Sequence, residues 1–110
     1  MQVSVRRLDK TTIFDVSGDV DLASSPAERK ALLHEVSDEC IPRVLLNLSQ
    51  VRYMDSSGVA SMVESLKASR DRGSRFVLFG LSGAPREVLQ LQRLLKTFEI
   101  YDTEAEALAS

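Results

Sequence analysis

Residues 43–66 read RVLLNLSQVRYMDSSGVASMVESL, and this stretch decides the fold. Its beginning, residues 43–48, is a nearly continuous apolar run, which is typical of a central strand buried on both faces. Further along, four apolar residues recur at the spacing of one helical face: Val59, Met62, Val63 and Leu66. A buried strand that leads directly into an amphipathic helix predicts one unit of an α/β fold.

The rest of the chain supplies further strands around this unit. Residues 3–7 and 12–16 alternate apolar and polar side chains, and the short polar segment between them favours a hairpin. Residues 76–81 (FVLFGL) form a second run of the buried type, and residues 98–101 are a candidate for a short extended piece. We therefore expect a sheet of about four to five strands.

Helix start signals occur at three other places. A capping box with proline at the first helical position begins at Ser25, and Pro42 ends the segment. Pro85 opens another helix, for which we predict four inward-facing residues: Val88, Leu91, Leu94 and Leu95. A second capping box at residues 103–106 predicts a short final helix. With the helix of the opening stretch, this makes about four α-helices.

These elements predict one α/β domain spanning residues 1–110. A chain of 110 residues is long enough for one core and too short for two. The initial hairpin requires antiparallel strands, whereas each strand–helix–strand crossover requires parallel ones. The predicted architecture is therefore a central mixed β-sheet flanked by helices.

Composition excludes several classes of protein. The formal net charge of −2 argues against nucleic-acid binding, which usually needs a basic surplus. The single cysteine, Cys40, excludes an internal disulfide and a cysteine-based metal site. No stretch is apolar enough for membrane insertion, and the first residues lack the apolar core of a signal peptide. These features predict a cytoplasmic protein.

The sequence offers little for catalysis. A serine nucleophile needs a nearby base, and the only histidine, His34, lies in the middle of a predicted helix. Glycine-rich phosphate loops are absent, so we expect no cofactor. Asp19, Asp21 and Asp55 are candidate ligands for a hard cation, but the first two equally suit a loop and the third a helix cap. We predict no metal site and no enzymatic activity.

The corner formed by Asp55, Ser56, Ser57 and Gly58 has more polar side chains than a helix cap requires. One of the side chains of Asp55, Ser56 and Ser57 can accept hydrogen bonds from the unpaired backbone N–H groups at the helix start. At least one serine hydroxyl is then left exposed. A phosphoryl group there would add nearly two negative charges beside the carboxylate of Asp55. Any partner docked over the corner would then meet repulsion, so the corner suits a phosphorylatable docking surface.

Four stretches together resemble the STAS domains of the bacterial anti-sigma factor antagonist family. The second of them, RVLLNLSQVRYMDSSGV, is the most specific. It joins an apolar strand, Asn-Leu-Ser, a spacer and Asp-Ser-Ser-Gly in fixed order. The four stretches are SGDVDLASS, RVLLNLSQVRYMDSSGV, GSRFVLFGLS and REVLQLQRLLKTFEIYDTEAEAL, and the similarity extends over nearly the whole chain. A departure is Ala60, where the family often has a second glycine.

The resemblance implies a switch. In this family the serine after the motif aspartate, here Ser56, is phosphorylated by a partner that is both a serine protein kinase and the anti-sigma factor. Ser57 would be the neighbouring cap or contact serine, Asp55 and Asp21 would flank the site, and Gly58 would leave the corner open to a partner's backbone.

The unphosphorylated form would then bind the anti-sigma factor and release a sigma factor, phosphorylation would break the complex, and a phosphoserine phosphatase would restore it. We expect a monomer. The alternative is a STAS accessory subunit of an ABC-type lipid transport system, which binds the permease from the cytoplasmic side and uses the serines only as helix caps.

Overall fold

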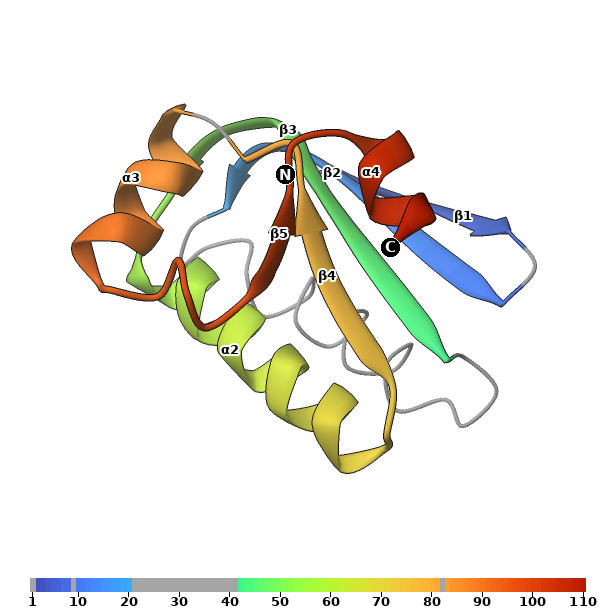
Figure 1. The fold of residues 1–110 in the computed structure, drawn as a ribbon. Coiled ribbons are helices and arrows are strands. Elements are labelled where there is room, and N and C mark those ends of the chain that lie inside the picture. Colours follow the sequence, from blue (N-terminus) through green and yellow to red (C-terminus); the bar gives the residue numbers. More distant parts are fainter. Residues whose placement is uncertain (1, 9, 21–41, 82) are drawn as a thin grey trace.

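The structure is a computed structural model that describes residues 2–8, 10–20, 42–81 and 83–110. Its strands are β1 (Gln2–Leu8), β2 (Thr11–Val20), β3 (Arg43–Met54), β4 (Arg75–Phe79) and β5 (Glu99–Tyr101). Its helices are α2 (Ser56–Asp71), α3 (Gly83–Leu91) and α4 (Glu104–Ala109). The strands form one sheet in the order β1-β2-β3-β4-β5, as Figure 1 shows.

The predicted α/β fold with a mixed sheet is confirmed. β1 pairs antiparallel with β2, and every other neighbouring pair is parallel. The extended piece near residue 100 is the fifth strand, β5. The helix predicted from Ser25 lies outside the described residues. Within the described ranges, no helix is long and apolar enough to cross a membrane.

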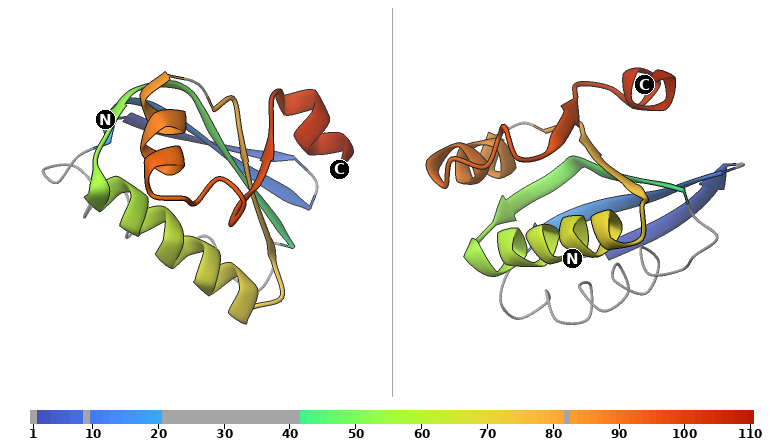
Figure 2. Two further views of the ribbon diagram at one scale, coloured as in Figure 1. Left: turned by 60° about the vertical axis from the view of Figure 1, so that its left-hand side comes forward. Right: turned by 60° about the horizontal axis from the view of Figure 1, so that its bottom comes forward.

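Side chains alternate between two cores, one on each face of the sheet. On one face Val44, Leu46 and Leu48 of β3 pack with apolar residues of α2 and α3. On the other face Leu45 of β3 packs with Ala107 of α4. Figure 2 shows α2 and α4 on these opposite faces. Because both faces are covered, the strand reads as a continuous apolar run, which is why it could be identified from the sequence.

β2 and β3 are both longer than predicted. Residues 17–20, which lie beyond the strand predicted at residues 12–16, continue β2 and pair with the second half of β3. The register shifts twice in this region, between Asp15 and Ser17 and between Gly18 and Asp19. Gly18 has a φ of 85°, which a glycine adopts without strain. These irregularities interrupt the period-2 pattern, so the alternation test missed the strand extension.

The prediction that Leu91 faces inward is wrong. α3 buries Pro85 and Leu89, and Leu91 is 83% exposed. Two residues correspond to about 200° around a helix, so Leu91 points away from the face that carries Leu89. The helix ends there, since Arg93 adopts a φ of 58° and the Leu94 amide bonds back to the Leu89 carbonyl oxygen at 2.8 Å. Leu94 and Leu95 are half-buried after this reversal.

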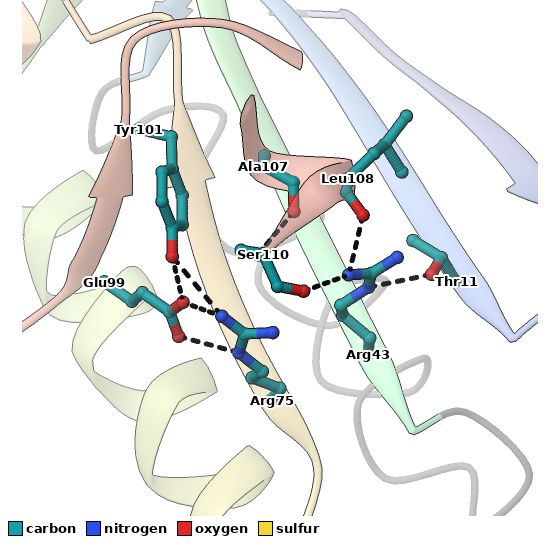
Figure 3. A network of polar contacts seen from close by, with 8 residues as sticks. All are labelled: Thr11, Arg43, Arg75, Glu99, Tyr101, Ala107, Leu108 and Ser110. Atoms are coloured by element: carbon teal, nitrogen blue, oxygen red, sulfur yellow. Dashed lines mark hydrogen bonds and ion pairs between the residues drawn. The ribbon is translucent and has the colours of Figure 1, made fainter. Parts of the chain in front are cut away.

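Arginine side chains fasten α4 and the neighbouring strands to the sheet. Arg43 donates to the carbonyl oxygens of Leu108 and Ser110 at 3.3 and 3.2 Å, where α4 ends, as Figure 3 shows. Arg75 of β4 is paired with Glu99 of β5, and the Tyr101 hydroxyl donates to the same carboxylate at 2.8 Å. These contacts connect β3 to the end of α4, and β4 to β5.

A second fastening joins β1 to α4. Arg6 bonds the Asp15 carboxylate with its Nε at 2.6 Å and its Nη2 at 2.8 Å, and it reaches Glu104 as well. Asn47 donates to the same Asp15 oxygen that accepts from Nη2, at 2.8 Å. Hydrogen bonding from Arg6 lowers the pKa of Asp15 below its ordinary value, and hydrogen bonding from Arg75 does the same to the pKa of Glu99.

We predict that acid weakens the fold through these two carboxylates. A carboxyl group whose pKa is lower in the folded than in the unfolded state stabilises the fold at pH values above its unfolded-state pKa of about 4. This stabilisation is lost as the pH falls through the folded-state pKa. Urea unfolding should show that the free energy of unfolding falls between pH 7 and pH 2. Asp15→Asn should make this fall smaller. An Asp15→Asn variant with the full acid dependence would contradict this prediction.

The packing of α3 generates a second prediction. Leu89→Ala should lower the free energy of unfolding by about 2–5 kcal/mol, because Leu89 is fully buried. Leu91→Ser should change it by no more than about 0.5 kcal/mol, as for other exposed positions. Urea unfolding of both variants measures the difference. A comparable loss in Leu91→Ser would mean that Leu91 packs against the protein.

Candidate functional site

The corner lies where two parallel strands end together. Val20, the last residue of β2, is the register partner of Met54, the last residue of β3. The next amide, that of Asp55, donates to the carbonyl oxygen of Val20 at 3.1 Å, and α2 begins at Ser56. The carboxyl ends of parallel strands are where open α/β sheets commonly place their functional residues. The chain therefore passes from strand to helix through a single residue.

Asp55 caps α2. Its backbone is extended, and its Oδ1 accepts from the amides of Ser57 at 3.0 Å and Gly58 at 3.2 Å. The same oxygen accepts from the Ser57 hydroxyl at 2.7 Å. Of the three polar side chains that compete for the cap, the carboxylate takes it and Ser57 supports it. This pair satisfies the first amides of the helix, which would otherwise lack partners.

Ser56 is the exposed residue of the corner, as the excess of capping groups predicted. It is the first residue of α2, and its hydroxyl makes no cap contact that the structure describes. Its one described side-chain contact comes from Gln92, whose Nε2 donates to Oγ at the long distance of 3.5 Å. Figure 1 shows how the start of α2 and the end of α3 lie beside each other. A group added to this hydroxyl would project toward solvent without breaking the cap.

The structure gives Gly58 a role other than the expected one. Gly58 is buried, and a Cβ there would lie 2.7 Å from Cγ1 of Val20 and 3.1 Å from its carbonyl oxygen. The glycine therefore lets α2 approach the end of β2 closely. The interpretation that it leaves the corner open for a partner's backbone is corrected, because the space is filled from within the protein.

Arg52, Tyr53 and Gln92 lie near the corner in sequence or in space and were not predicted as site residues. Arg52 and Asp19 form an ion pair at 3.5 Å across the last part of β3 and β2. Tyr53, two residues before the cap, is 49% exposed. Gln92 lies 36 positions from Ser56 along the chain. Arg52 and Tyr53 precede the cap in the sequence, whereas only the fold brings Gln92 to the corner, and no spacing in the sequence could have indicated it.

Two of the three aspartates that were candidate cation ligands have other partners in the structure. Asp19 is paired with Arg52, and Asp55 caps α2. Asp21 lies outside the described residues. Among the residues described, no group of three His, Cys, Asp or Glu side chains is arranged to hold a metal ion.

Comparison with known proteins gives these features a family. The model of the STAS domain matches residues 2–107. The chain belongs to the STAS domain family. The resemblance noted in the sequence is thereby confirmed, and the match extends over both the strand-to-helix corner and the final helix. STAS membership accounts for the fold and leaves the role of the corner to be argued from its chemistry.

Two of the similar proteins are anti-sigma factor antagonists by name. The anti-sigma-B factor antagonist of Listeria monocytogenes is 33% identical over 107 residues, which cover 96% of this chain and 91% of the relative. The crystal structure of an anti-sigma factor antagonist from Mycobacterium paratuberculosis has a TM-score of 0.88 at 27% identity, and the likeness covers 98% of this chain and 91% of that one.

A third similar structure is SpoIIAA, a Bacillus cell fate determinant, in its phosphorylated form. It has a TM-score of 0.76 at 20% identity, and the likeness covers 98% of this chain and 97% of that one. At this level of identity the likeness establishes a shared fold. Together the three comparisons span essentially the whole STAS domain.

We predict that Gly58→Ala destabilises the STAS domain by about 1 kcal/mol. Overpacking against Val20 costs about 1–3 kcal/mol, and the better helix propensity of alanine offsets part of it. Urea unfolding measures the change. The matched test is the same substitution in a Val20→Ala background, where the clash with Cγ1 is relieved and the loss should shrink. An equal loss in both backgrounds would rule out this packing role.

Proposed function

We propose that this chain is an anti-sigma factor antagonist switched at Ser56. Its unphosphorylated form binds an anti-sigma factor that is also a serine kinase, and a sigma factor is thereby released. Phosphorylation of Ser56 by that kinase breaks the complex, and a phosphoserine phosphatase restores it. The relatives with this name, similar over nearly the full chain, support the proposal.

The observation that carries the proposal is the division of tasks within the corner. Asp55 and Ser57 are bonded to each other and to the helix start, whereas Ser56 is exposed and takes no part in the cap. A kinase can therefore reach the Ser56 hydroxyl on the folded protein. Phosphorylation leaves the hydrogen bonds of the cap in place, so the modification changes the surface and not the fold.

Electrostatics explains why a phosphate would break the complex. It adds nearly two negative charges beside the Asp55 carboxylate. A partner that covers the unmodified corner would have to remove water from this charge or place a cation against it. We assign partner binding to Asp55, Ser56 and Ser57, with Gly58 supporting them from beneath. We also assign it to Asp21, which directly follows the last residue of β2 in the sequence.

This function is that of a binding module. It needs no cofactor, catalytic residue or metal of its own, because the partner kinase supplies the chemistry of phosphoryl transfer. We further propose that the chain acts as a monomer in the cytoplasm, where sigma factors meet RNA polymerase. The alternative, a lipid-transport accessory subunit, is not favoured by the names of the similar proteins.

The decisive experiment is phosphorylation of the purified chain by candidate serine kinases of the anti-sigma type, with Mg²⁺ and ATP. Wild type should gain one phosphate by intact mass, Ser56→Ala none, and the matched control Ser57→Ala should still be modified. Ser56→Asp should bind the kinase roughly a hundredfold more weakly than wild type, in line with the several kcal/mol of like-charge contacts at interfaces.

Two results would count against this function. Phosphate on Ser56→Ala would move the switch to another residue. Equal retention of wild type, Ser56→Ala and Ser56→Asp by a purified ABC permease, with no kinase acting on any of them, would assign the chain to lipid transport.

A further inference from the structure

Four large apolar side chains are exposed in the described part of the protein, and two of them, Tyr53 and Leu91, are close in sequence to residues of the corner. Tyr53 is 49% exposed and stands two residues before the cap. Leu91 is 83% exposed and precedes Gln92, whose side chain reaches the Ser56 hydroxyl. The other two, Val5 and Leu8, lie on the edge strand β1.

Tyr53 and Leu91 come from different parts of the chain, which the fold joins through the contact of Gln92 with Ser56. α3 lies against β3, the strand that ends just after Tyr53. Leu91 points outward at the end of α3, because it lies about 200° around the helix from the buried Leu89. Leu91 also lines a shallow surface hollow with Glu87, Gln90 and Arg93.

Resting on the proposed function, we infer that Tyr53 and Leu91 are the two apolar anchors by which the anti-sigma factor kinase binds this chain, one on each side of Ser56. Aromatic and aliphatic side chains in the dry centre of an interface supply much of its binding free energy. The occupant must be the kinase, since the contact of Gln92 with Ser56 makes this surface continuous with the serine that the kinase modifies.

This arrangement gives the switch its sensitivity. Anchors on both sides of Ser56 mean that the partner must exclude water from the serine when it buries them. A neutral hydroxyl tolerates this, because Gln92 already provides a hydrogen bond. A phosphate in the same place retains its water, and the two apolar contacts can no longer close around it. The charge therefore acts on the contacts that hold the complex together.

The test measures the affinity of the purified kinase that modifies Ser56 for Tyr53→Ser, Leu91→Ser and the matched control Leu8→Ser. Leu8 is 43% exposed and pairs with Thr11 at the start of β2, whereas the corner lies at Val20, the end of that strand. Each corner variant should bind at least about tenfold more weakly than wild type, and the control should bind like wild type.

Conservative variants guard against effects on folding. Tyr53→Phe and Leu91→Met retain apolar surface, so they should bind within about threefold of wild type, in the range of volume-conserving changes. Urea unfolding of every variant verifies that the protein used in the binding assay is folded. A corner variant that lost stability would be judged by its conservative partner, in which the anchor is kept.

The outcomes separate this inference from the proposed function. If Ser56→Asp loses binding but Tyr53→Ser or Leu91→Ser binds like wild type, the two-anchor surface is wrong and the switch stands. If Leu8→Ser loses as much as the corner variants, the effect is not local and the inference fails. If no kinase modifies or binds wild type, both fail together.

Discussion

The parallel pairing of β2 with β3 is the constraint on which the rest of this structure depends. Because the two strands end at the same level, Val20 can accept the Asp55 amide, and the chain has one residue in which to turn from strand into helix. A helix that starts so abruptly needs its first amides satisfied at once. The Asp55 carboxylate does this, and its place fixes where Ser56, Ser57 and Gly58 lie.

Neighbouring residues at this corner differ in how much the fold depends on them. Ser57 is tied to the cap and Gly58 is buried against Val20, so changes at either position disturb the structure. Ser56 stands between Asp55 and Ser57 and is exposed. A site that must change charge reversibly is best placed on a residue the fold does not need, supported by residues that it does.

The sequence predicted the sheet well wherever burial was uniform. The apolar runs that became β3 and β4 lie between two cores, so hydrophobicity alone identified them. It failed for residues 17–20, where register shifts interrupt the alternation. It also failed at Leu91, since the buried face of α3 carries Pro85 and Leu89, and Leu91 lies about 200° around the helix from Leu89.

The corner itself was predictable in outline and undecided in detail. The surplus of polar side chains indicated an exposed hydroxyl, and Ser56 has one. Which group would cap could not be read from the sequence, because aspartate and serine are nearly equivalent in that position. Gly58 was misread because a buried glycine and an open one look the same in a sequence. The approach of Gln92 to Ser56 depends on tertiary structure alone.

The position of α4 in the chain has a consequence for synthesis of the protein. Ile13, Leu45, Val77 and Phe79 form the core on the α4 face of the sheet, and Ala107 of α4 packs against them. Among the described helices α4 is the one that covers this face, and it is synthesised after all five strands. Apolar surface that is transiently exposed during synthesis is prone to aggregation. Nascent chains of this protein should therefore engage chaperones until α4 emerges.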